Sequence, residues 1–108
     1  MQLFAVRIIR LVEDLPKALA NDIVGKQLIR SATSVGANYR AACRARSKPD
    51  FISKIGIAEE EADEAQYWLE ILLELGHVDV DRFKELHTEA RELTAILASS
   101  GKTARTNR

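Results

Sequence analysis

The residues of this 108-residue chain that look best suited to chemistry are five carboxylates packed into a short run: Glu59, Glu60, Glu61, Asp63 and Glu64. Clustered carboxylates can hold a divalent metal or exchange protons in acid–base catalysis. Helical spacing divides this run, however, because Glu60 and Asp63 fall on an outward stripe while Glu61 and Glu64 fall between the apolar positions 57 and 68. We therefore expect Glu61 and Glu64 to be partly buried, with Arg or Asn partners on the preceding helix or across a subunit contact.

The histidines do not complete a metal site. A di-metal helical bundle carries a Glu-x-x-His pair on each of two helices. Here Tyr67 stands where Glu64 would need a histidine, and Lys84 stands three residues before His87. No serine has a histidine base nearby in the helical layout, and no two glycines are close enough for a phosphate-binding loop. The sequence predicts no metal, no cofactor and no enzyme; the weakest alternative is a metal or hydrolytic enzyme using Glu61, Glu64 and His87.

Basic side chains form the second candidate for chemistry. They share one helical stripe and continue into the following turn: Lys26, Arg30, Arg40, Arg44, Arg46 and Lys48. Such a stripe could follow a phosphate backbone, with an affinity that falls as salt rises. The alternative is that these cations pair with acids of the next helix or are simply solvated. The formal net charge is zero, which argues against a strongly basic nucleic-acid binder but leaves one basic face possible.

Long helices must position these residues. The apolar residues between Pro49 and Gly76 are spaced alternately by four and three positions: Phe51, Ile55, Ala58, Ala62, Ala65, Leu69 and Leu72. This heptad pattern predicts a long packed helix. Ser47 can cap its start, Pro49 fits its first turn, and Gly76 provides a left-handed stop.

The remaining segments have the same helical character. We predict four helices at about residues 3–15, 21–46, 48–75 and 79–99, with Asn21 or Asp22 capping the second, and a disordered basic tail at 101–108. Short connections favour an all-α, antiparallel, up-down-up-down four-helix bundle in one domain, residues 1–100. The lone Cys43, predicted to be a small buried residue, fits a reducing cytoplasm. No apolar stretch is long enough for a membrane span, so a cytoplasmic protein with no membrane partner is expected.

A second apolar stripe on the third helix predicts self-association. Trp68, Ile71 and Leu75 lie beside the main seam, and a helix that is apolar over more than one face has more surface to bury than one core covers. We predict that these three residues, with Glu61 and Glu64, form an oligomer interface.

Two sequence runs, read together, identify a family. Residues 28–38 read LIRSATSVGAN and residues 44–52 read RARSKPDFI, followed by Ile57-Ala58 and by Glu61-Ala62-Asp63-Glu64. Together they resemble the bacterial four-helix-bundle family, also called the 23S rRNA intervening-sequence protein family. The resemblance implies a homo-oligomer, usually a pentameric ring. Some members are encoded within insertions in large-subunit rRNA genes, and similar proteins are accessory subunits of diversity-generating retroelements that bind nucleic acid and a reverse transcriptase.

The combined expectation is a non-enzymatic bundle that assembles with itself into a ring and binds structured RNA such as 23S rRNA. Its predicted RNA contacts are the six basic residues named above. The alternative is a protein–protein scaffold, or a retroelement accessory subunit, with no direct role on rRNA.

Overall fold

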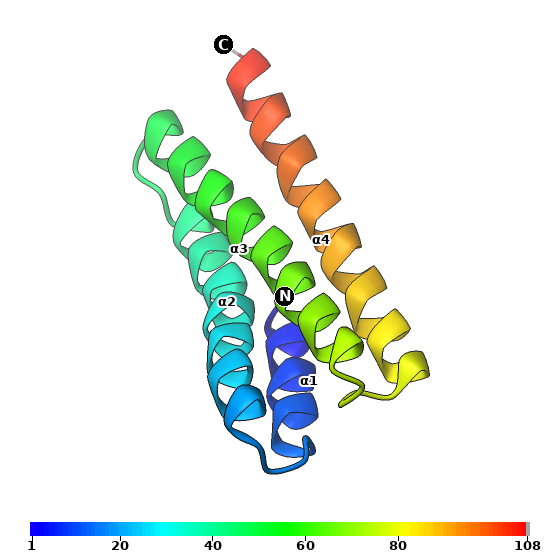
Figure 1. Ribbon diagram of the computed structural model, residues 1–108. Helices are drawn as coiled ribbons and strands as arrows, with labels where there is room; N and C mark the ends of the chain where they lie inside the picture. The colour runs from blue at the N-terminus through cyan, green and yellow to red at the C-terminus, as the bar shows by residue number, and fades with distance from the viewer. Residues whose placement is uncertain (108) are drawn as a thin grey trace.

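The computed structural model describes residues 1–107 and consists, over that range, of four α-helices and their connections (Figure 1). The helices are α1 (Gln2–Glu13), α2 (Leu19–Cys43), α3 (Lys48–Glu74) and α4 (Val80–Thr106). They form an elongated bundle with principal extents of 49 × 20 × 19 Å. No helix within residues 1–107 is both long and apolar enough to cross a membrane.

The helices pack in an order that places α3 between α2 and α4, while α1 lies against α2 and α4. In the ion pairs between α1 and α4, the residue numbers rise along one helix as they fall along the other. Arg7 pairs with Glu89 and Asp14 with Arg82 between α1 and α4. Helices α1 and α4 therefore run in opposite directions. Figure 1 shows each helix running opposite to the one before it.

The limits of α3 follow from local side-chain chemistry. Ser47 Oγ accepts a hydrogen bond from the Asp50 backbone N–H at 3.1 Å, which satisfies one of the free N–H groups at the helix start. At the other end, Gly76 has a φ of 74°. The N–H of Gly76 donates to the Leu73 carbonyl, and that of His77 donates to the Leu72 carbonyl. This pair of bonds is a Schellman motif, which explains why a glycine ends the helix.

The core confirms the heptad seam of α3. All of its predicted positions are fully buried except Phe51, which is half-buried. One core cluster joins Leu69 and Leu72 to Phe4 and Ile8 of α1, together with residues of α2 and α4. A second cluster, on the α2, α3 and α4 segments beyond the start of α1, includes Ile55. Together the two clusters bury the apolar seam of α3 from Ile55 to Leu72.

The predicted helix limits need several corrections. Helix α1 ends at Glu13 and α2 spans Leu19–Cys43, so Asn21 is not a cap but lies inside α2. Its buried side chain instead donates to the Pro16 carbonyl and hydrogen-bonds with His77. The connection between α2 and α3 is correspondingly longer than predicted, because α2 ends three residues before the expected position 46.

The predicted end of the last helix near Ser99, with a disordered tail after it, was wrong for residues 101–106. Helix α4 continues to Thr106. Gly101 is buried, and a Cβ at that position would lie only 3.4 Å from Ile55 Cγ2, so the glycine lets α4 pack closely on α3. The hydroxyls of Ser100 and Thr106 donate to carbonyls four residues earlier, which satisfies polar groups without breaking the helix. Arg108 lies outside the described residues.

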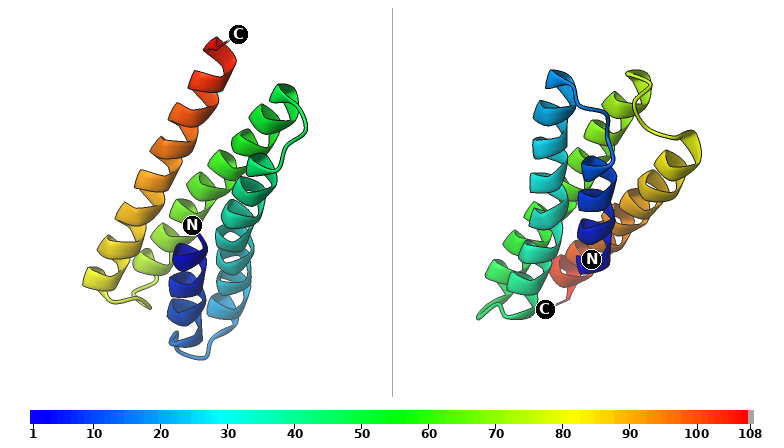
Figure 2. Two further views of the ribbon diagram at one scale, coloured as in Figure 1. Left: turned by 180° about the vertical axis from the view of Figure 1, so that it is seen from behind. Right: turned by 90° about the horizontal axis from the view of Figure 1, so that it is seen from below.

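Helix α1 is much shorter than the others, with 12 residues against 25 for α2 and 27 each for α3 and α4. The N-terminus consequently lies partway along the bundle, whereas the C-terminus lies at one end (Figure 2). Four helices are present over one half of the bundle and three over the other.

Candidate nucleic-acid interface

The predicted basic stripe divides into three parts in the structure, and Arg30 is the first. Its guanidinium pairs with the Glu61 carboxylate at 2.7 Å and with the Glu64 carboxylate, while its Nε donates to the Gln27 side chain at 3.0 Å. Glu64 also accepts a hydrogen bond from Trp68 Nε1 at 2.9 Å. The partner expected for the two glutamates on the preceding helix is therefore Arg30, whose charge and donors are already engaged.

Lys26 lies near the opposite end of α2 from the other predicted contacts. It lines a hollow beside the α1–α2 connection together with Pro16, Lys17 and Asp22. At the α-helical rise of 1.5 Å per residue, Lys26 and Arg44 are separated by about 27 Å along α2. A single short stretch of phosphate backbone would not reach both.

The remaining four cations do come together. Arg40 and Arg44 lie at the end of α2, Arg46 lies in the connection, and Lys48 begins α3. All four side chains are exposed. Among residues 1–107, none of the four forms an ion pair with a carboxylate. This group is the largest set of neighbouring unpaired charges in the predicted stripe, and it is free to meet an anionic partner.

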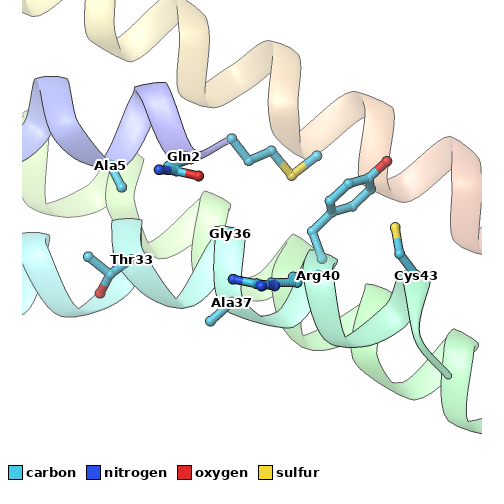
Figure 3. A pocket seen from close by; sticks show the side chains of 9 residues that line it. Gln2, Ala5, Thr33, Gly36, Ala37, Arg40 and Cys43 are labelled. Atoms are coloured by element: carbon cyan, nitrogen blue, oxygen red, sulfur yellow. The ribbon is translucent and has the colours of Figure 1, made fainter.

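A hollow of about 690 Å³ lies beside this group, between the start of α1 and the second half of α2. It is lined by small residues of both helices, Ala5, Gly36 and Ala37. Arg40 and Cys43 line the part of it near the C-terminal end of α2 (Figure 3). Cys43 is exposed rather than buried as predicted, because it lies beyond the start of the short helix α1.

Tyr39 of α2 also lines this hollow. Its pKa is raised, chiefly by its side-chain hydrogen bond with Cys43 and also by the charge of that group and by burial. The phenol therefore stays protonated at neutral pH and can donate a hydrogen bond. No histidine is among the residues that line the hollow.

The carboxylates and the histidine considered as catalytic candidates lie in separate contacts. Glu61 and Glu64 pair with Arg30 of α2. His87 of α4 instead hydrogen-bonds to Glu70 through Nε2 at 2.9 Å. No group of three or more metal-ligating side chains occurs within residues 1–107.

The predicted oligomer residues lie on the side of the bundle where α2 meets α3. Trp68 and Ile71 are half-buried and pack against the core of their own subunit, whereas Leu75 is 44% exposed. Two further exposed apolar residues follow the same helical stripes. Ile57 stands four residues before Glu61, and Ile23, which is 56% exposed, stands seven residues before Arg30. We refer to Ile23, Ile57 and Leu75, with the Arg30–Glu61–Glu64 cluster between them, as the α2–α3 face.

Asn21 and His77 form a polar contact that sequence reasoning missed. The Asn21 side chain is 3% exposed, and its Oδ1 lies 2.7 Å from His77 Nδ1, while its Nδ2 donates to the Pro16 carbonyl at 2.8 Å. This contact ties the α1–α2 connection to the α3–α4 connection. Because the partners are 56 positions apart in the chain, no local pattern announces it.

These features define a class of protein: a small helical bundle with a cluster of unpaired cations among the residues that the structure describes. The chain belongs to the family of 23S rRNA-intervening sequence proteins, whose model matches residues 1–99. It is also similar to the crystal structure of a protein of unknown function from the S23 ribosomal protein family of Bacteroides thetaiotaomicron. The two share 37% identity with a TM-score of 0.83, over 94% of this chain and 90% of the other. No curated protein matches the chain.

Proposed function

We propose that this protein binds structured RNA, such as 23S rRNA, as a non-enzymatic homo-oligomer. The observation that carries the proposal is the cluster of Arg40, Arg44, Arg46 and Lys48, which is exposed and has no carboxylate partner within residues 1–107. Guanidinium groups match the geometry of phosphate oxygens and can bind them through two parallel hydrogen bonds. Membership of a family named for an rRNA intervening sequence favours RNA as the source of those phosphates.

The proposed assembly is an up-down-up-down antiparallel bundle repeated in a ring, a pentamer by analogy with the family that the sequence resembles. The exposed apolar residues of the α2–α3 face support it, since the free energy falls when a second subunit covers such residues and removes them from water. A ring would also repeat the cationic cluster once per subunit. Several weak phosphate contacts could then act on one RNA molecule, which raises the overall affinity above that of a single subunit.

Electrophoretic mobility shift with rRNA fragments tests the proposal. Binding should be detectable at about 50 mM salt and weaken steeply as salt rises, because each phosphate contact releases condensed counterions. The logarithm of the association constant should fall linearly with the logarithm of salt concentration. Absence of a shift at about 50 mM salt would rule out the RNA-binding function.

A protein scaffold is the second candidate, and the α2–α3 face is the observation that favours it. A scaffold would use Ile23, Ile57 and Leu75 to hold a different polypeptide rather than another copy. Treating a lysate with nuclease before pull-down separates the two functions. An RNA-binding protein loses its RNA-bridged partners after this treatment, whereas a scaffold retains them.

A further inference from the structure

Charge is separated along the length of the bundle. The end that contains the α2–α3 connection and the C-terminal part of α4, residues 40–50 and 98–107, has six cations and only one acid, Asp50. The opposite end, residues 13–22 and 70–82, has seven acids and only two cations, Lys17 and Arg82. The zero net charge of the chain therefore conceals one strongly basic end on a bundle 49 Å long.

The C-terminal part of α4 contributes to this basic end. Gly101 packs beside Ile55 of α3, and the Arg105 guanidinium lies 3.3 Å from the position that a Gly101 Cβ would occupy. Because α3 and α4 run in opposite directions, Arg105 lies at the level of the first turns of α3. Lys102 and Arg105 are both exposed, and neither forms an ion pair with a carboxylate among residues 1–107.

Helix dipoles explain only part of this accumulation. A cation near a helix C-terminus is stabilised by the partial negative charge there, which accounts for Arg40 and Arg105 in the last turns of α2 and α4. Lys48 lies at the opposite pole, as the first residue of α3, where the partial charge is positive and an acid would be preferred. Arg46 lies in the connection, outside both helices. The helix dipoles therefore do not explain the placement of Lys48 or Arg46.

We propose that Lys102 and Arg105 of α4 bind the same RNA phosphate backbone as Arg40, Arg44, Arg46 and Lys48. This inference rests on the proposed RNA-binding function and assigns its surface to the basic end of the bundle. Arg30, held by two glutamates, and Lys26, near the other end of α2, are not part of that surface. The RNA-binding site thus joins the end of α2, the start of α3 and the C-terminal part of α4, which is far from the other two in the sequence.

The double variant Lys102→Gln/Arg105→Gln tests the assignment. Glutamine retains helix propensity, so the fold of α4 should persist, which circular dichroism checks. With an rRNA fragment that the unmodified protein binds, loss of two phosphate contacts should lower affinity at about 100 mM salt on the order of tenfold. The slope of log affinity against log salt should become shallower by roughly two for each bound subunit. The matched control is Lys84→Gln/Arg91→Gln, which removes two exposed cations from α4 outside the basic end and should leave both quantities unchanged.

Each result has a distinct meaning. A slope that is unchanged in Lys102→Gln/Arg105→Gln, while the unmodified protein still binds RNA, overturns this assignment and leaves the proposed function standing. Equal losses in the test and control variants overturn it as well, because only bulk charge would then matter. Polyglutamate and unlabelled RNA are compared as competitors at the same concentration of negative charge. If polyglutamate displaces the labelled RNA equally effectively, the basic end is instead a site for acidic proteins. Failure of the unmodified protein to bind any RNA removes the proposed function itself.

Discussion

At the scale of single residues, buried or multiply bonded polar side chains have a structural role, whereas exposed cations without a carboxylate partner among residues 1–107 can bind a partner. Arg30 illustrates the difference. Its sequence position suggests a phosphate contact, but Glu61, Glu64 and Gln27 occupy its donors. Because Arg30 is 47% exposed, solvent screens these ion pairs, and their net contribution to stability is modest, about 1 kcal/mol or less. Their larger effect is to fix the side chain against α3.

Asn21 provides a residue-scale prediction. The substitution Asn21→Ala removes both hydrogen bonds of this side chain, so the Pro16 carbonyl and His77 Nδ1 each lose their bond to Asn21. We expect the free energy of unfolding to fall by about 1–3 kcal/mol, measured by urea denaturation. Asn38→Ala is the control, since Asn38 bonds only to Ser34 within its own helix and is half-exposed, so its loss should be smaller. Equal losses in the two variants would contradict a connecting role for Asn21.

At the scale of the helices, two glycines in helix interiors have opposite packing environments. A Cβ at Gly25 would lie 2.7 Å from Val12 Cγ1, so Val12 or the α1 backbone must shift to admit a side chain there. Apart from its chain neighbours and the backbone of its own helix, a Cβ at Gly56 of α3 would have no heavy atom within 4 Å. The absence of a side chain is thus required by packing at one site and is only an entropic cost at the other.

These environments predict opposite effects of one substitution. Gly56→Ala should raise the free energy of unfolding by up to about 1 kcal/mol through helix propensity. Gly25→Ala should lower it despite the same propensity gain, because the overpacking penalty is about 1–3 kcal/mol and the β-branched Val12 has few alternative rotamers. Thermal unfolding followed by circular dichroism compares the two. An increase in melting temperature for Gly25→Ala would show that α1 moves away at little cost.

At the scale of the whole molecule, the sequence predicts what depends on local periodicity and fails where distant segments meet. The apolar seam of α3, its Ser47 cap and its Gly76 stop are all encoded within a few residues of where they act. Helix α4 was predicted to stop near Ser99 because Ser-Ser-Gly commonly ends helices. Gly101 is instead buried beside Ile55 of another helix, and α4 continues past it to Thr106. The same limitation hid the basic end, since Lys102 and Arg105 join Arg46 and Lys48 only after the chain has reversed direction.

Self-association is the prediction that belongs to the whole molecule. The α2–α3 face exposes Ile57 to 38% beside the Arg30–Glu61–Glu64 cluster, and covering such residues is what favours assembly. Light scattering at micromolar concentration should therefore give the mass of an oligomer for the unmodified protein. Ile57→Lys places an ammonium group on this face, where burial without a partner is costly, and should shift the mass toward the monomer. Ile96→Lys is the matched control, because Ile96 is 53% exposed on α4, outside the α2–α3 face, and its substitution should leave the mass unchanged. A monomeric mass for the unmodified protein would refute the oligomer altogether, whereas an unchanged mass for Ile57→Lys would place the interface elsewhere on the bundle.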